Sequence, residues 1–193
     1  GAARPQPYPT KRVRRVVPLA PGGGNDILGR FFAKHMVEGL GQQMIVETRP
    51  GGGGLVGGEF VARAAPDGYT LVFGGSGLMV VSLTYRKLDI LKDFTPIANI
   101  GEYSSLLVVH PSLPVKSVAD LIRFAKARPG QLNYGSAGTG SAGHLVIEMF
   151  RLRAGLDMVH VPYKGAGPAL TELMAGQVSM LFSNPLGSGG HVK

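Results

Sequence analysis

Cysteine and tryptophan are absent from this sequence, and aromatic residues make up only 7% of its 193 residues. Without cysteine the chain can form no disulfide, offer no thiol nucleophile and bind no metal through thiolates. No apolar run approaches the ~20 residues that a membrane-spanning helix requires. The hydrophobic share of 44% still allows a buried core, and the length fits one large domain or two small lobes.

Acidic residues are also scarce, with 12 Asp and Glu against 20 Lys and Arg, which gives a net charge of +8. Apart from Lys11, Arg12, Arg14 and Arg15, the basic residues are scattered and do not alternate with aromatic residues. This scatter argues against nucleic-acid binding. A basic protein that attracts small anions has the same charge balance.

Glycine is abundant, with 30 residues in clusters that have no three-residue period. This excludes collagen and predicts several tight backbone loops. Between the clusters of the first half, β-rich segments alternate with helical periodicity. The expected strands are 13–19, 44–47 and 69–73, and the expected helices are 26–40 and 55–65. This order predicts a mostly parallel, doubly wound sheet.

A less regular stretch, 74–100, separates this half from a second one in which the pattern restarts. The second half predicts strands at 106–110, 132–134, 158–161 and 177–182, and helices at 117–127, 144–154 and 168–175. The fold class is therefore α/β, with a first lobe at 1–100 and a second at 101–193 that meet near residues 98–104. Residues 183–193 show no closing element, so we expect the second lobe to be incomplete at its C-terminal end.

The first candidate site is the loop between the first strand and the first helix, formed by Pro21, Gly22, Gly23, Gly24, Asn25 and Asp26. In open α/β sheets, ligands bind at the carboxyl ends of strands. Free N–H groups and the positive end of a helix favour an anion at this place. A plain glycine turn with Asn25 as N-cap has the same sequence pattern.

The second candidate site repeats this arrangement in the second half and adds hydroxyl groups. It comprises Ser136, Ala137, Gly138, Thr139, Gly140 and Ser141, followed by His144 at the start of a helix. Two such loops that face each other across a cleft would form a donor-lined pocket that suits a carboxylate. His144 is interpreted as a residue that supports the loop.

Other chemistries find little support. Residues 138–143 match G-x-G-x-x-G, but a dinucleotide site needs an acidic residue at the end of the next strand, and Asp157 lies at its start. There is no G-x-S-x-G, no Walker lysine motif, and no metal-ligand spacing among the five histidines. We therefore predict no enzyme activity, no metal and no cofactor. His160 is interpreted as a structural histidine, and Lys164 is either a neutralising cation or a solvated one.

Eight segments together resemble the substrate-binding proteins of tripartite tricarboxylate transporters, the Bug-type periplasmic receptors of bacteria. They are Tyr8-Pro9, VPLAPGGGND at 17–26, RPG at 49–51, ARAAPDGYTL at 62–71, DFTP at 93–96, LNYGS at 132–136, GHL at 143–145 and HVPYKG at 160–165. They run in the order of the family across nearly the whole chain, so the match is specific.

The resemblance implies a two-lobed periplasmic-binding-protein ("flytrap") fold that closes on a carboxylate, often through backbone amides and bridging waters. It implies export to the periplasm with a signal peptide removed before Tyr8, and a membrane transporter or a sensor as partner. The ligand loops carry over to 22–26 and 136–141, with Ser76, Ser183 and Asn184 as further wall. The first seven residues are typical of a processed or engineered end.

The chain departs from the family in two respects. It has Ser183 where many members carry an acidic residue, which puts a preference for amino-bearing ligands in doubt. It also lacks the C-terminal portion that returns to the first lobe. The sequence thus predicts a receptor for a di- or tricarboxylate or an acidic amino acid. The alternatives are an anion-handling α/β enzyme of related architecture, or a non-binding fragment that self-associates through unfinished sheet edges.

Overall fold

The computed structural model describes residues 8–192, and its first half is built on a three-stranded parallel sheet. The central strand is β1 (Val13–Val17), flanked by β2 (Met44–Thr48) and β3 (Thr70–Val72). The first two strands are connected through α1 (Gly24–Leu40), and β2 leads through η1 (Gly52–Gly54) into α2 (Leu55–Ala62). The side chains of Val13, Val16 and Val17 are buried, as expected for a central strand that is covered on both faces. The expected processed end at 1–7 lies outside the described residues.

A second, separate sheet of four strands forms in the second half, in the order β4-β7-β5-β6. Its strands are β4 (Leu106–Val109), β5 (Asn133–Ser136), β6 (Val159–Pro162) and β7 (Met180–Ser183). Only the β4–β7 pair is antiparallel. Its helices are α5 (Val118–Lys126), α6 (Ala142–Ala154) and α7 (Ala166–Met174). The prediction of two-lobed, mostly parallel α/β architecture is confirmed, whereas the division near 98–104 stays a prediction.

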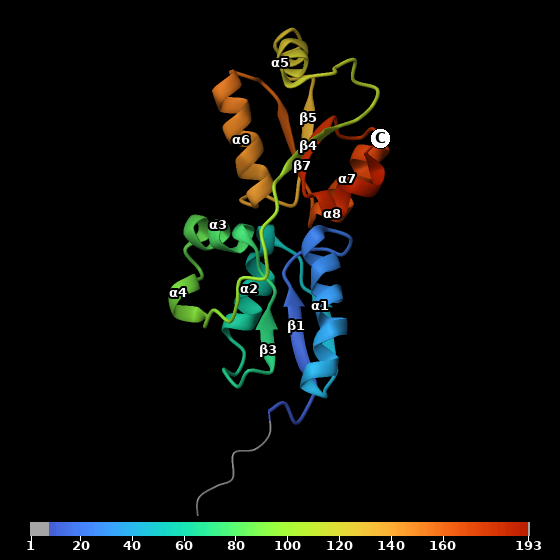
Figure 1. Cartoon of the computed structure of the whole chain (residues 1–193). Helices are drawn as coiled ribbons and strands as arrows, with labels where there is room; N and C mark the ends of the chain where they lie inside the picture. The colour runs from blue at the N-terminus through green and yellow to red at the C-terminus, as the bar shows by residue number, and fades with distance from the viewer. Residues whose placement is uncertain (1–7, 193) are drawn as a thin grey trace, which may run out of the picture.

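The two sheet units stack end to end, and the loops that follow β1 and β5 lie where they meet (Figure 1). Helix α1 runs away from this junction into the first unit, and α6 runs away from it into the second (Figure 1). Local signals explain the helix ends. Gly41 ends α1 in the left-handed region, with φ 65°, and Ser117 caps α5 by accepting a hydrogen bond from the Asp120 N–H at 3.1 Å.

Two short regions are more regular than the sequence predicts. Within 74–100 the chain forms α3 (Ser76–Tyr85) and α4 (Ile90–Asp93), and after β7 it forms α8 (Pro185–Ser188) and η2 (Gly189–His191). Helix α3 is rich in β-branched residues, which are modest helix formers. It is stabilised by packing, because Leu78 and Val81 are buried in one apolar cluster with Leu55 and Leu88.

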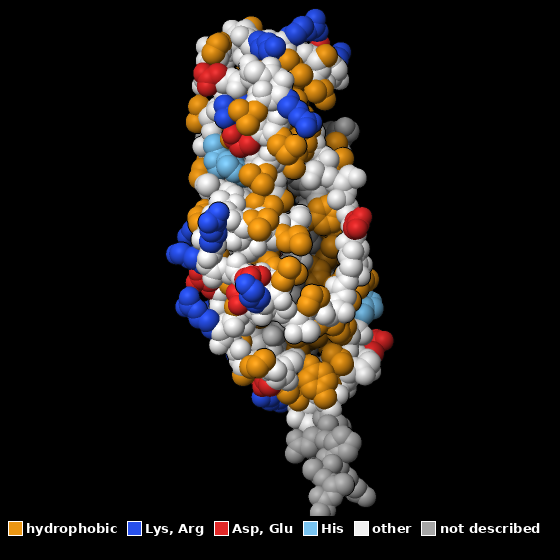
Figure 2. Space-filling view, turned by 90° about the vertical axis from the view of Figure 1, so that its left-hand side faces the viewer, with side chains coloured by type: hydrophobic (Ala, Val, Ile, Leu, Met, Phe, Trp, Pro, Cys, Tyr) orange, Lys and Arg blue, Asp and Glu red, His pale blue; other side chains and the backbone are white. Residues whose placement is uncertain are grey.

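Some apolar side chains remain uncovered. They gather on the face that carries α3, α4 and α6 (Figure 2). Leu83, Leu91 and Leu152, which belong to these three helices, are 77%, 82% and 69% exposed. Such a cluster is typical of a surface that packs against another segment or protein. Within residues 8–192, no helix is long and apolar enough to cross a bilayer.

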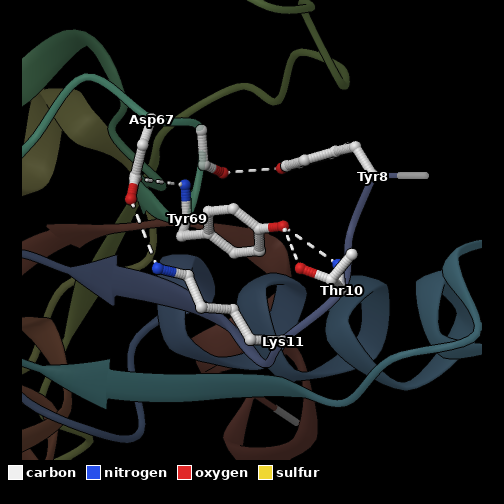
Figure 3. A network of polar contacts seen from close by, with 6 residues as sticks. Tyr8, Thr10, Lys11, Asp67 and Tyr69 are labelled. Atoms are coloured by element: carbon white, nitrogen blue, oxygen red, sulfur yellow. Dashed lines mark hydrogen bonds and ion pairs between the residues drawn. The ribbon is translucent and has the colours of Figure 1, made fainter. Parts of the chain in front are cut away.

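The start of the described chain is anchored at the far end of the first unit. The Tyr8 hydroxyl donates to the carbonyl of Gly68 at 2.6 Å, and the Thr10 N–H donates to the Tyr69 hydroxyl at 2.9 Å (Figure 3). Lys11 lies 3.4 Å from the carboxylate of Asp67 (Figure 3). These contacts tie the residues before β1 to the turn before β3, so the network belongs to the architecture and lies away from the candidate loops (Figure 1).

Candidate functional site

The first loop leaves the backbone amides at the start of α1 available. Its N-cap residue is Gly23, which has no side chain to occupy them. Within the described part of the chain, the N–H groups of Gly24 and Asn25 have no hydrogen-bond partner. These amides lie at the positive end of a 17-residue helix, where an anion is favoured.

Asp26 has a different part in this loop, because its carboxylate is already bound. The side chain is buried; it accepts a hydrogen bond from the Gly22 N–H at 3.1 Å and another from Arg30 at 2.9 Å. Asp26 therefore holds the loop in shape and neutralises Arg30. A ligand at this loop is left to the backbone amides.

The second loop is held by internal hydrogen bonds, three of which involve side chains. The Gly138 N–H donates to Ser136 Oγ at 3.1 Å, the Gly140 N–H donates to His144 Nδ1 at 3.3 Å, and the His144 N–H donates to Ser141 Oγ at 3.3 Å. The amides of Ala142 and Gly143, in the first turn of α6, have no partner among residues 8–192. The loop thus presents the same arrangement as the first one, a helix start with open donors.

The start of α3 completes the arrangement. A Cβ added to Gly75 would lie 3.4 Å from Asn25 Nδ2, and one added to Gly77 would lie 3.6 Å from the Ala142 nitrogen. The N-terminal ends of α1, α3 and α6 therefore converge on one region, with Ser76 exposed between the two glycines. Three helix N-termini around one point favour a bound anion more than any one of them alone.

The predicted wall after β7 also reaches the first loop. Ser183 and Asn184 are both buried. The Asn184 side chain caps α8 by accepting from the Gly187 N–H at 2.9 Å, and it lies directly against Gly24. This places residues from opposite ends of the chain side by side at the start of α1.

Several residues at the junction were not assigned to the site from the sequence. A Cβ added to Gly53 would lie 2.9 Å from the Thr139 carbonyl oxygen, and one added to Gly167 would collide with the carbonyl of Pro21. The Ala20 N–H donates to the Lys164 carbonyl at 3.0 Å. The two units therefore contact each other mainly through backbone atoms at glycine positions. The four glycines at 51–54 and the pair Gly165 and Gly167 were the sequence signal for this close approach.

Tyr103, in the segment that joins the units, is a further missed contact. Its hydroxyl lies 3.3 Å from Asn25 Oδ1, and partial burial raises the pKa of this phenol. Through this bond the connecting segment reaches the first candidate loop.

Next to the second loop lies a cluster of polar and aromatic side chains around His160, which the sequence did not predict. Ser136 Oγ is 2.7 Å from His160 Nε2. The His160 ring is stacked on Tyr134 and tilted against His144, with centroid distances of 5.0 and 4.1 Å. Burial lowers the pKa of His160, and the neighbouring His144 lowers it further. Hydrogen bonds from Arg151 hold the pKa of Glu148 at about 2.

The remaining predicted residues take ordinary positions. Ala137 is half-buried and Gly140 is buried, while Thr139 and Lys164 are exposed.

A groove of about 370 Å³ runs from Pro21 and Gly22 along α7. A larger apolar groove, about 480 Å³, lies at α5, α6 and Phe182. No group of three acidic or histidine side chains suited to a metal occurs in the described part of the chain.

Comparison with known proteins places this geometry in context. A family model described as "Tripartite tricarboxylate transporter family receptor" matches residues 28–188. BugT of Bordetella pertussis is 36% identical over 184 residues, which cover 92% of this chain and 56% of BugT. The chain therefore spans little more than half the length of this curated relative.

Solved structures agree with this match. An R. palustris protein determined with adipate is 39% identical, with a TM-score of 0.89 over 95% of this chain and 62% of that one. MatC from Rhodopseudomonas palustris, with bound malate, is 31% identical, with a TM-score of 0.86 over 94% of this chain and 63% of MatC. A structure described as a periplasmic transporter is 40% identical, with a TM-score of 0.88 over 94% and 62% of the two chains.

Proposed function

The chain belongs to the tripartite tricarboxylate transporter receptor family, and on this basis we propose that it captures a small carboxylate between its two α/β units. The observation that carries the proposal is the convergence of the N-terminal ends of α1, α3 and α6. The open amides of Gly24, Asn25, Ala142 and Gly143 are its principal donors.

Chemistry favours a carboxylate over other small solutes. A cation would meet three positive helix ends, and Asp26 is occupied by Arg30 and Gly22. A sugar would need acceptors as well as donors, and the loops offer chiefly backbone N–H groups. Charge-assisted hydrogen bonds from such groups are strong, and they strengthen as closure of the units removes water. Two carboxylates in one ligand could use the two loops at once.

The supporting residues have separate parts in this proposal. Asp26, Ser136 and His144 shape the loops, Gly22 to Asn25 and Gly138 to Ser141 approach the ligand, and Ser76, Ser183 and Asn184 line the wall. The missing acidic group at Ser183 favours plain di- or tricarboxylates over amino acids. We propose a periplasmic location and delivery to a transporter or a sensor. Support comes from the family match and the likeness to a periplasmic transporter.

One observation favours a hydrolase as a second candidate, because Ser136 Oγ lies 2.7 Å from His160 Nε2. A serine nucleophile needs an exposed oxygen and a histidine that a third group orients. Ser136 is buried and its oxygen already accepts from Gly138. Glu148, the nearby carboxylate, binds Tyr134 and Arg151. These contacts therefore favour the receptor hypothesis over the hydrolase hypothesis.

Isothermal calorimetry on the 193-residue chain tests the proposal. The panel contains adipate, malate, a tricarboxylate, aspartate, glutamate and two neutral sugars, all at pH 8. We expect a dicarboxylate or tricarboxylate to bind with a Kd of about 100 μM or tighter, about −5.5 kcal/mol. Binding of sugars alone, or turnover of an ester that is lost in Ser136→Ala, would contradict the receptor.

A further inference from the structure

Two histidines next to the second loop, His144 and His160, differ in how protonation would affect their hydrogen bonds. His144 Nδ1 accepts the N–H of Gly140 at 3.3 Å, so this nitrogen carries no proton. A protonated imidazole has hydrogen on both nitrogens and accepts nothing. Protonation of His144 would therefore break a bond that shapes the loop.

His160 has a partner that tolerates both states. Its Nε2 lies 2.7 Å from Ser136 Oγ, a hydroxyl oxygen with one proton and two lone pairs. One lone pair accepts the Gly138 N–H at 3.1 Å. With an unprotonated Nε2, the Ser136 hydroxyl donates to His160. With a protonated Nε2, His160 donates to the second lone pair, and the Ser136 proton turns to another acceptor.

The groups around His160 make its charge responsive to a nearby anion. Tyr134 from β5 stacks on the His160 ring, and His144 from α6 lies against it at a tilt of 33°. Glu148, also on α6, favours the charged ring, but its carboxylate is bound by Tyr134 and Arg151. Burial and His144 oppose the charge and lower the pKa of His160. The free protein therefore disfavours imidazolium here, and an added anion shifts this balance.

We propose that His160 is a positioning residue for the carboxylate site, which takes up a proton when the ligand binds and acts through its bond to Ser136, the serine that shapes the second loop. This rests on the proposed function, because the carboxylate must lie at the second loop. Because ligand binding and proton uptake are thermodynamically linked, a ligand that favours protonated His160 binds more tightly as pH falls.

The test compares adipate and malate binding at pH 6 and pH 8 by calorimetry. The wild-type chain is expected to bind at least about twofold more tightly at pH 6 than at pH 8, because a rise in the pKa of His160 on binding adds affinity as pH falls toward that pKa. His160→Gln keeps a donor at the Nε2 position and cannot be protonated, so it should lose the tighter binding at pH 6. His110→Gln is the matched control, because His110 follows β4 at the opposite end of the sheet from Ser136. It should keep the wild-type slope.

Imidazole ¹⁵N titration of the wild-type chain gives a second readout if His160→Gln does not fold. The His160 signal should titrate at higher pH with adipate bound than without it. An unchanged titration, a flat wild-type profile, or a slope that persists in His160→Gln would overturn the proposal while leaving the receptor intact. Absence of carboxylate binding at both pH values would instead remove the proposed function and this proposal with it.

Discussion

Gly24 and Asn184 lie so close together that a Cβ on Gly24 would overlap the Asn184 amide group. We therefore expect Gly24→Ala to lower the free energy of unfolding by about 1–3 kcal/mol, because the methyl group must displace Asn184 or α1. Gly39→Ala is the matched control in the same helix, with nothing within 4 Å of the added Cβ, and it should stabilise by about 0.5–1 kcal/mol. Urea denaturation of both variants measures this. Equal stability changes would show that Asn184 moves freely.

Two serines cap helices in the same way, but only one lies at the candidate site. Ser141 caps α6 and Ser117 caps α5. Replacing either by alanine should cost about 0.5–2 kcal/mol of stability through the lost cap. Only Ser141→Ala should weaken carboxylate binding, because only α6 starts at the proposed site. Thermal melts and calorimetry separate the two effects, and unchanged affinity in Ser141→Ala would place the ligand elsewhere.

Glu148 should make the second unit sensitive to acid. Its pKa is lowered from 4.5 to about 2, first by hydrogen bonds from Arg151. Because the folded pKa lies below the unfolded one, this stabilisation is complete above pH 4.5 and is lost as pH falls toward 2. We expect a loss of about 1–2 kcal/mol after allowance for solvent screening. Urea melts between pH 7 and pH 2.5 measure it, and Glu148→Gln should show a smaller acid loss. A variant as acid-sensitive as the wild type would contradict this assignment.

Asp26 is expected to be structural to the first loop. Asp26→Asn removes the charge that pairs with Arg30 inside a buried site, and it should cost about 1–3 kcal/mol of stability. Glu59→Gln removes a similar pair with the exposed Arg63 and should cost about 0.5 kcal/mol or less. Denaturant midpoints compare the two. Equal losses would mean that the Asp26 interactions are no stronger than a surface ion pair.

Much of the fold follows from local patterns. The valines of β1, the glycine that ends α1 and the serine that caps α5 each act within a few residues, so periodicity predicted these elements and capping rules account for the helix ends. Helix α3 was missed, because its β-branched residues disguise a helix that packing of Leu78 and Val81 stabilises. The loops were found because glycines at a strand end before a helix are themselves a local signal.

The composition, the order of strands and helices, and the two glycine loops were determined by the sequence itself, since each depends on neighbouring residues. Only the tertiary structure decided which loop groups remain open. Asp26 and His144 satisfy amides within their own loops, while Ser136 meets His160 and Gly24 meets Asn184 across long stretches of chain. Those pairings depend on how strands order in a sheet and how the two units pack. Hydrogen bonds and close contacts form between surfaces that only the folded chain brings together.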